Sequence, residues 1–284
     1  MTKGRRWLTG CGLGCGVLAL VGIGACVVAT LYIEHTFRGI EKAIASHDAL
    51  TAELGDVGAY APPPDGAPPP DRLELFVAVR EEVAGERARV ERAVTELPPP
   101  ELTVAVVGKI RLGVEALGDL VDSIGTYLRA RNLALLERRM SVGEYVYIYT
   151  LAFYSALGHT PGEAPEVRQD PDGVRIAVFD EGGFNEQAVR RRYRRYILGM
   201  VREQLASAGP EAEAGDGPSW RSRLEREIQR LEVDPGRVLW QDGLPPPVEA
   251  ALRPFRDRLE ATYSAATNPI ELPLAEHEVP DEWR

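Results

Sequence analysis

The stretch best suited to ligand chemistry is residues 141–158, which read SVGEYVYIYTLAFYSALG. It places one carboxylate, Glu144, beside the phenols of Tyr145 and Tyr149 in a run that is otherwise apolar. A few polar groups in an apolar setting are typical of a small-molecule pocket. One hypothesis is therefore a ligand-binding or hydrolytic domain with a tyrosine-lined pocket near Glu144. The alternative is that these tyrosines are buried core residues whose hydroxyl groups only complete hydrogen bonds.

The element that carries these residues has two competing interpretations. Every second residue from Tyr145 to Tyr149 is a tyrosine, which indicates a strand. Ser141 and Glu144, however, have the spacing of a capping box at the start of a helix, and Gly158 suits a helix end. The length of the apolar run also favours a helix. We expect a helix at the centre of the core, because the run is apolar on all sides.

The sequence contains no recognisable catalytic motif. It has no G-x-S-x-G elbow and no H-E-x-x-H zinc motif, and all its cysteines lie before residue 27. Asp170, Asp172 and Glu181 match three ligand positions of a calcium loop. Val174 and Arg175, however, stand where that loop needs an oxygen ligand and a glycine. We predict no catalytic residue, metal site or cofactor.

Residues 10–26, GCGLGCGVLALVGIGAC, combine closely spaced glycines and cysteines. A phosphate-binding loop would need a preceding strand and a following lysine or acidic partner, which this segment lacks. Small residues four apart let membrane helices approach closely, so the glycines predict pairing with another membrane helix, including self-association. The cysteines nearest the inner face, Cys11 and Cys15, are candidates for acylation. The glycines with this spacing are Gly10, Gly12, Gly14 and Gly16.

Residues 7–33 contain no charged side chain. As a helix this run would be about 40 Å long, which is enough to cross a hydrocarbon core of about 30 Å with some tilt. Trp7 and Tyr32 stand near its ends, where amphipathic rings favour the headgroup zone. The basic residues before it place the N-terminus inside. The sequence therefore predicts a single-pass anchor in the inner (cytoplasmic) membrane, with the bulk of the chain extracytoplasmic.

Two other interpretations of this segment are weaker. A cleaved secretory signal has an apolar core of roughly 7–15 residues and an A-x-A-like site, whereas this run is longer and lacks the site. Residues 23–26, IGAC, look like a degenerate lipoprotein box. The apolar residues 27–33 follow that cysteine, where a mature lipoprotein turns polar. We therefore favour a retained signal-anchor.

The rest of the chain reads as a helical domain joined to the anchor by a stalk and a spacer. Apolar spacing predicts a helix over 71–97 that opens with an Asp71/Glu74 capping box, and a long helix over 101–140 that folds back on it. A last helix is expected to kink near Pro254, and the turn chemistry of 159–183 predicts a short β-hairpin.

The fold class is mainly α: an N-terminal transmembrane helix followed by an extracytoplasmic helical bundle with one short hairpin. The predicted parts are a cytoplasmic N-terminus (1–6), the anchor (7–33), a helical stalk (34–56), a Pro-rich spacer (57–70), the helical domain (71–267) and an acidic, Pro-containing tail (268–284).

A helix predicted to begin at 184 or 185 carries a dense arginine run. The favoured interpretation is that these arginines pair with neighbouring acidic helices. A contact with anionic headgroups is the alternative if this helix lies near the membrane. The arginines are Arg190, Arg191, Arg192, Arg194 and Arg195.

Charge and composition narrow the class of function. The chain has a net charge of −10, and nucleic acid is excluded as a general partner because an acidic protein repels phosphate backbones. Arginine is used almost to the exclusion of lysine, which we attribute to a GC-rich bacterial genome. The sequence therefore predicts a membrane-anchored interaction or scaffold protein of a bacterial cell envelope, without catalysis. Its expected partners are the lipid bilayer and an unidentified protein.

Overall fold

The computed structural model describes residues 39–97, 107–163, 186–208 and 219–273. Every regular element in these ranges is a helix, so the prediction of a mainly helical protein is confirmed. Within the same ranges, no helix has both the length and the apolar character needed to cross a bilayer. The predicted anchor at 7–33 lies outside the described residues, as does the core of the predicted hairpin at 166–176.

The chain begins its described part with a helix over residues 39–54. The elements that follow are η1 (Val57–Ala59), α2 (Pro70–Glu82), α3 (Ala84–Thr95), α4 (Val107–Glu137), α5 (Val142–Tyr149), η3 (Thr150–Ala156), α6 (Glu186–Ser207), α7 (Trp220–Val233), α8 (Pro246–Leu252), η4 (Arg253–Phe255), α9 (Arg256–Thr262) and α10 (Asn268–Glu271).

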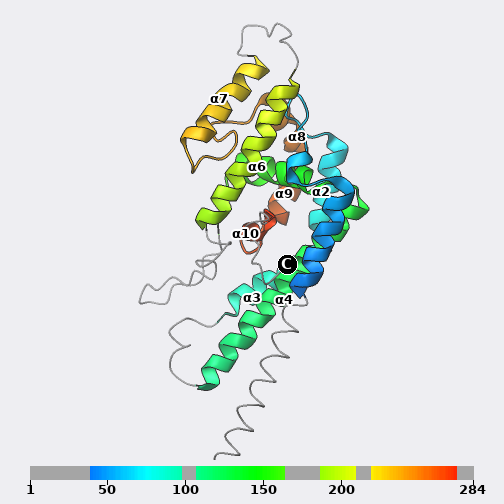
Figure 1. Cartoon of the computed structure of the whole chain (residues 1–284), viewed down its shortest axis with the longest axis vertical. Helices are drawn as coiled ribbons and strands as arrows, with labels where there is room; N and C mark the ends of the chain where they lie inside the picture. The colour runs from blue at the N-terminus through cyan, green and yellow to red at the C-terminus, as the bar shows by residue number, and fades with distance from the viewer. Residues whose placement is uncertain (1–38, 98–106, 164–185, 209–218, 274–284) are drawn as a thin grey trace, which may run out of the picture.

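The elements are arranged along one long axis. The pair α3 and α4 packs at one end, and the pair α6 and α7 packs at the other (Figure 1). Between them α5 and η3 form a central segment, which contacts α2, α8 and α9. This central segment is the aromatic run at 141–158, and the structure confirms that it is helical and buried.

Several helices begin, end or break where a capping residue, a glycine or a proline predicted it. The Ser141 side chain accepts a hydrogen bond from the Glu144 backbone N–H at 3.1 Å, which confirms the predicted cap. Gly158 has a φ of 79°, a conformation that glycine adopts without strain at a helix end. The last predicted helix is indeed broken at Pro254, where η4 separates α8 from α9.

The expected single helix over 71–97 is two helices. The first of them, α2, begins at Pro70. Its N-cap, Pro69, makes no side-chain hydrogen bond, so the predicted capping box at Asp71 is wrong. Proline suits this first position because its missing N–H would be unpaired there anyway. The helix breaks at Val83, which separates α2 from α3.

The described residues of the predicted stalk (39–56), spacer (57–70) and tail (268–273) pack against the helical domain. Leu50 and Val57 are buried in the main core. In the Pro-rich segment, the carbonyl of Gly66 accepts a hydrogen bond from the Tyr147 hydroxyl at 2.8 Å. At the other end of the chain, Asn268 and Glu271 are buried in α10. These residues therefore contact the helices of the predicted domain, whose boundaries stay a prediction.

Candidate functional site

The three predicted pocket residues lie in a packed interior. Tyr145 and Tyr149 are fully buried, and their rings pack against each other with centroids 6.0 Å apart. Glu144 is largely buried and forms an ion pair with Arg72, whose Nε lies 2.5 Å from Glu144 Oε1. The two pockets described below are lined by none of these three residues. A ligand pocket near Glu144 stays a prediction.

A buried ionic cluster surrounds the carboxylate of Glu271. Its Oε1 accepts hydrogen bonds from Arg80, from the Tyr127 hydroxyl at 2.5 Å and from Thr267, and its Oε2 accepts from the Tyr145 hydroxyl at 2.8 Å. Arg131 Nη1 adds a second cation, 3.2 Å from Oε2. The carboxylate thus has five donors, four from the helices α2, α4 and α5 and one from Thr267, the residue before α10.

Electrostatics keep Glu271 ionised. Burial alone would raise the pKa of this carboxyl group, but the positive charges of Arg80 and Arg131 and the hydrogen bonds from Tyr127 and Arg80 lower it to about 2. Burial raises the pKa of the Tyr145 phenol well above its usual value, against the opposing charge of Arg80. A carboxylate held ionised by two guanidinium groups is a poor proton acceptor, so this cluster has the properties of a structural centre.

A second cluster of buried polar side chains depends on the helix geometry of η3, which is a π-helix. The hydroxyls of Tyr149 and Tyr154 both donate to Asn268 Oδ1, at 3.1 and 2.7 Å. Residues five apart share a face in a π-helix, whose hydrogen bonds run from i to i+5, and not in an α-helix. The Asn268 amide in turn donates to the carbonyls of Thr160 and Glu163. This group therefore joins the end of the central segment to α10.

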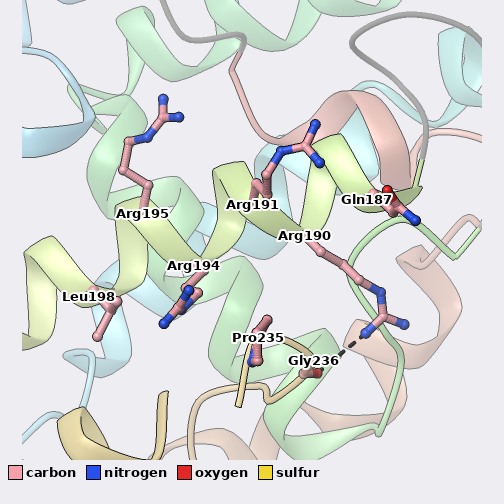
Figure 2. Close-up of a pocket in the computed structure, with 8 residues that line it drawn as sticks. All are labelled: Gln187, Arg190, Arg191, Arg194, Arg195, Leu198, Pro235 and Gly236. Carbon is pink, nitrogen blue, oxygen red and sulfur yellow. Dashed lines mark hydrogen bonds between the residues drawn. The ribbon is translucent and has the colours of Figure 1, made fainter. Parts of the chain in front are cut away.

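A groove lies beside α6, and we call it the α6 groove. It has a volume of about 440 Å³. The turn at 235–236 forms its other wall, and the carbonyl of Gly236 accepts a hydrogen bond from Arg190 at 3.3 Å (Figure 2). The residues that line it are Gln187, Arg190, Arg191, Arg194, Arg195, Leu198, Pro235 and Gly236.

Among the residues that the structure describes, four guanidinium groups and no carboxylate line the α6 groove. Arg190 pairs with Glu186, 2.7 Å away, on the preceding turn of α6. Arg194 instead donates to two backbone carbonyls at the end of α7, those of Leu231 and Glu232, so it caps that helix while keeping its charge. Arg191 and Arg195 are exposed. The groove is therefore a cationic site on an acidic chain, and it is suited to an anionic ligand.

A second pocket, of about 420 Å³, lies between α7 and the loop after it. Its arginines are accompanied by two carboxylates: Glu227 lies 3.1 Å from Arg237, and Asp242 lies 2.8 Å from the same side chain. The charges of this pocket largely pair within it. It is a weaker candidate for an anionic ligand than the α6 groove.

The buried charged residues that sequence reasoning missed are Arg80, Arg131 and Glu271. Arg80 lies four residues after the buried Phe76, on the apolar stripe of its helix. This position in the sequence could have indicated a buried charge. Glu271 lies in a short segment whose sequence resembles a tail.

Among the described residues, no group of three or more His, Cys, Asp or Glu side chains could hold a metal ion. Comparison with protein-family models, with curated proteins and with solved structures finds no match to this chain.

Proposed function

We propose that this chain is a single-pass membrane protein whose extracytoplasmic helical domain works by binding, as an interaction or scaffold module, and not by catalysis. The observation that carries the proposal is the α6 groove, whose described lining residues include four arginines and no carboxylate. Guanidinium groups present several donors in a fixed plane and are the preferred partners of carboxylate and phosphate groups. The ligand of this module is therefore anionic.

The interior supports binding rather than catalysis. The buried charged groups Arg80, Arg131 and Glu271 satisfy one another, and the phenols around them complete the same hydrogen-bond network. Catalytic acids and bases need access to a substrate and a pKa near the working pH. The carboxylate of Glu271 is fully buried and its pKa is about 2, so it meets neither condition.

The membrane anchor is proposed on the sequence of residues 7–33 alone, with the N-terminus inside the cytoplasm. Its glycines, Gly10 to Gly16, are proposed to pair it with a second copy. Protease added to spheroplasts tests the placement: the domain should be degraded while a fragment of anchor size stays protected. A domain that is degraded only after lysis would contradict the extracytoplasmic placement.

A photocrosslinking amino acid at position 191 tests the binding surface. In native membranes, the full chain carrying it should form an adduct, with protein or lipid, that becomes weaker as salt is added, because exposed charges are screened. The same amino acid at Arg256, which is exposed on α9, is the matched control and should form no such adduct. Equal adducts at both positions, or none at position 191, would refute the α6 groove as the binding surface.

A further inference from the structure

The helix over residues 39–54 and α4 run side by side in the same direction. Three contacts between them join residues that are each 86 positions apart in the sequence. In an antiparallel pair this spacing would change by two with every residue, so the constant value shows that the helices are parallel. The pairs are Gly39 and Gly125, whose backbones cross closely, Ser46 and Asn132, whose side chains are hydrogen-bonded at 3.1 Å, and Glu53 and Arg139, which form an ion pair at 3.2 Å just past the end of α4.

The parallel direction determines which part of α4 lies toward the chain that precedes Gly39. Because α4 begins at Val107, 18 of its residues lie before Gly125. At 1.5 Å per residue, this part of α4 projects about 27 Å past the level of Gly39. It projects toward the side from which the chain enters the helix over residues 39–54, and α3 packs beside α4 at this end of the domain (Figure 1).

The chain between the predicted anchor and Gly39 is shorter than this projection. The anchor is predicted to end at Ile33, and the six residue steps from there to Gly39 span at most about 22 Å when fully extended. The projecting end of α4 therefore reaches the bilayer when the helix over residues 39–54 leads directly away from it. The pair α6 and α7, at the opposite end of the domain, is then held away from the membrane (Figure 1).

The start of α4 has a composition suited to a membrane surface. Residues 107–114 read VGKIRLGV, in which two basic residues stand among aliphatic residues and glycines, and the first acidic residue of α4 is Glu115. Basic and aliphatic residues together suit the headgroup region, where charges meet phosphate and apolar groups meet the acyl boundary. Farther along the same half of α4, Leu117 is 53% exposed and is one of three large apolar residues exposed among those that the structure describes.

We infer that the first two turns of α4, with their two basic residues, bind the anionic headgroups of the membrane that anchors the chain. This inference rests on the membrane anchor of the proposed function and adds an orientation of the domain, with α3 and α4 toward the lipid and the α6 groove away from it. Each basic residue near an anionic lipid surface favours contact by about fivefold. The anchor raises the effective concentration of headgroups at α4, so two such charges suffice.

The test measures how close two glycines of the full chain lie to the bilayer. Gly108, in the first turn of α4, or Gly199 of α6 is replaced by cysteine after Cys11, Cys15 and Cys26 have been changed to alanine. Gly199 is the matched control, because a Cβ atom there would meet nothing within 4 Å. Each chain is labelled with a nitrobenzoxadiazole fluorophore and reconstituted in nanodiscs that contain phosphatidylglycerol, with or without a phospholipid that carries a nitroxide on its headgroup. The nitroxide should quench the probe at position 108 and leave the fluorescence of the probe at position 199 unchanged.

Removal of charge tests the chemistry of the contact. K109Q/R111Q should lower the ratio of quenched to unquenched probe at position 108 by about fivefold for each charge removed. R226Q/R256Q removes the same charge from exposed positions on α7 and α9 and should leave this ratio unchanged. Salt at about 1 M, which screens charges beyond about 3 Å, should act as K109Q/R111Q does.

Several results would overturn the inference while leaving the anchor intact. These are equal quenching at positions 108 and 199, quenching at 199 alone, no quenching at either position, or quenching at 108 that K109Q/R111Q leaves unchanged. A chain that does not incorporate into nanodiscs would instead refute the anchor and, with it, the short tether on which the inference rests. The incorporation step therefore separates failure of the proposed function from failure of the inference.

Discussion

Arg80 and Glu271 form an ion pair in which neither side chain is exposed to solvent. The two residues are 191 positions apart in the sequence, on α2 and α10. Tyr127 of α4 and Tyr145 of α5 donate to the same carboxylate, so one group joins four helices. This geometry makes Glu271 the residue that fixes the C-terminal segment to the core.

Replacing Glu271 with glutamine should destabilise the domain strongly. The substitution keeps the shape of the side chain but leaves the charges of Arg80 and Arg131 buried without a counter-ion. Breaking a buried pair in this way costs about 3–5 kcal/mol. The free energy of unfolding, measured by circular dichroism in urea on the full chain, should fall by that amount.

The control for this prediction is Glu249→Gln. Glu249 pairs with Arg253 at 3.1 Å, but both side chains are mostly exposed. Exposed pairs contribute about 0–1 kcal/mol, because water and salt screen them. Equal effects of the two substitutions would show that the cluster around Glu271 is not buried as described.

The stability of the protein should also depend on pH through Glu271. Its pKa is about 2 in the folded state, against an ordinary value of 4.5. The ionised group therefore stabilises the fold fully above about pH 4.5, and this contribution is lost as the pH falls toward 2. Over that range the group should account for a loss of about 1.4 kcal/mol per pH unit.

Glu271→Gln separates this effect from that of other carboxyl groups. Unfolding free energies of the wild type and the variant, measured from pH 6 to pH 2.5, should approach each other as the pH falls. A gap that stays constant through this window would mean that the pKa of Glu271 is not lowered in the folded protein.

The helical architecture could be predicted because apolar periodicity is a local property of the sequence. The positions of Ser141, Gly158 and Pro254 marked helix boundaries that the structure confirms, since each acts within a few residues of itself. The π-helical turn of η3 was not predictable from the run itself. The hydrogen-bond partner that its geometry serves, Asn268, lies 114 residues after Tyr154, whose hydroxyl donates to it.

The ionic cluster escaped prediction for a related reason. Arg80 and Glu271 are ordinary charged residues in an acidic chain, and nothing adjacent to either identifies the other as its partner. By contrast, five arginines of α6 lie within the six residues 190–195, so the sequence alone identified them. Which of its arginines would line a groove could not be predicted, because the second wall, at 235–236, comes from a distant turn.

The hydroxyl of Tyr145 should matter more to stability than that of Tyr147. Tyr145 is hydrogen-bonded to the charged Arg80 and Glu271, whereas Tyr147 donates to the neutral carbonyl of Gly66. Hydrogen bonds to charged groups contribute about 1.5–3 kcal/mol and neutral ones about 0.5–1.5 kcal/mol. Phenylalanine at each position, compared by urea unfolding, should show this order, and the reverse order would argue against the structural role of the cluster.

Gly125 of α4 is where the helix over residues 39–54 crosses most closely. A Cβ atom at this position would lie 2.5 Å from the carbonyl carbon of Gly39 and 2.7 Å from its oxygen. Backbone atoms cannot move aside as a flexible side chain can, so Gly125→Ala should force the two helices apart. The gain of about 1 kcal/mol in helix propensity offsets only part of an overpacking cost of about 1–3 kcal/mol. The thermal midpoint should therefore fall.

Gly199 of α6 provides the matched control, because a Cβ atom there would meet nothing within 4 Å. Gly199→Ala should raise the thermal midpoint, since alanine is favoured in an exposed helix by about 1 kcal/mol and no contact opposes it. In a domain of this size, each kcal/mol corresponds to about 2–4 °C. If both substitutions raised the midpoint equally, helix propensity alone would explain them. The close crossing at Gly39 and Gly125, and with it the docking of the helix over residues 39–54 on α4, would then be incorrect.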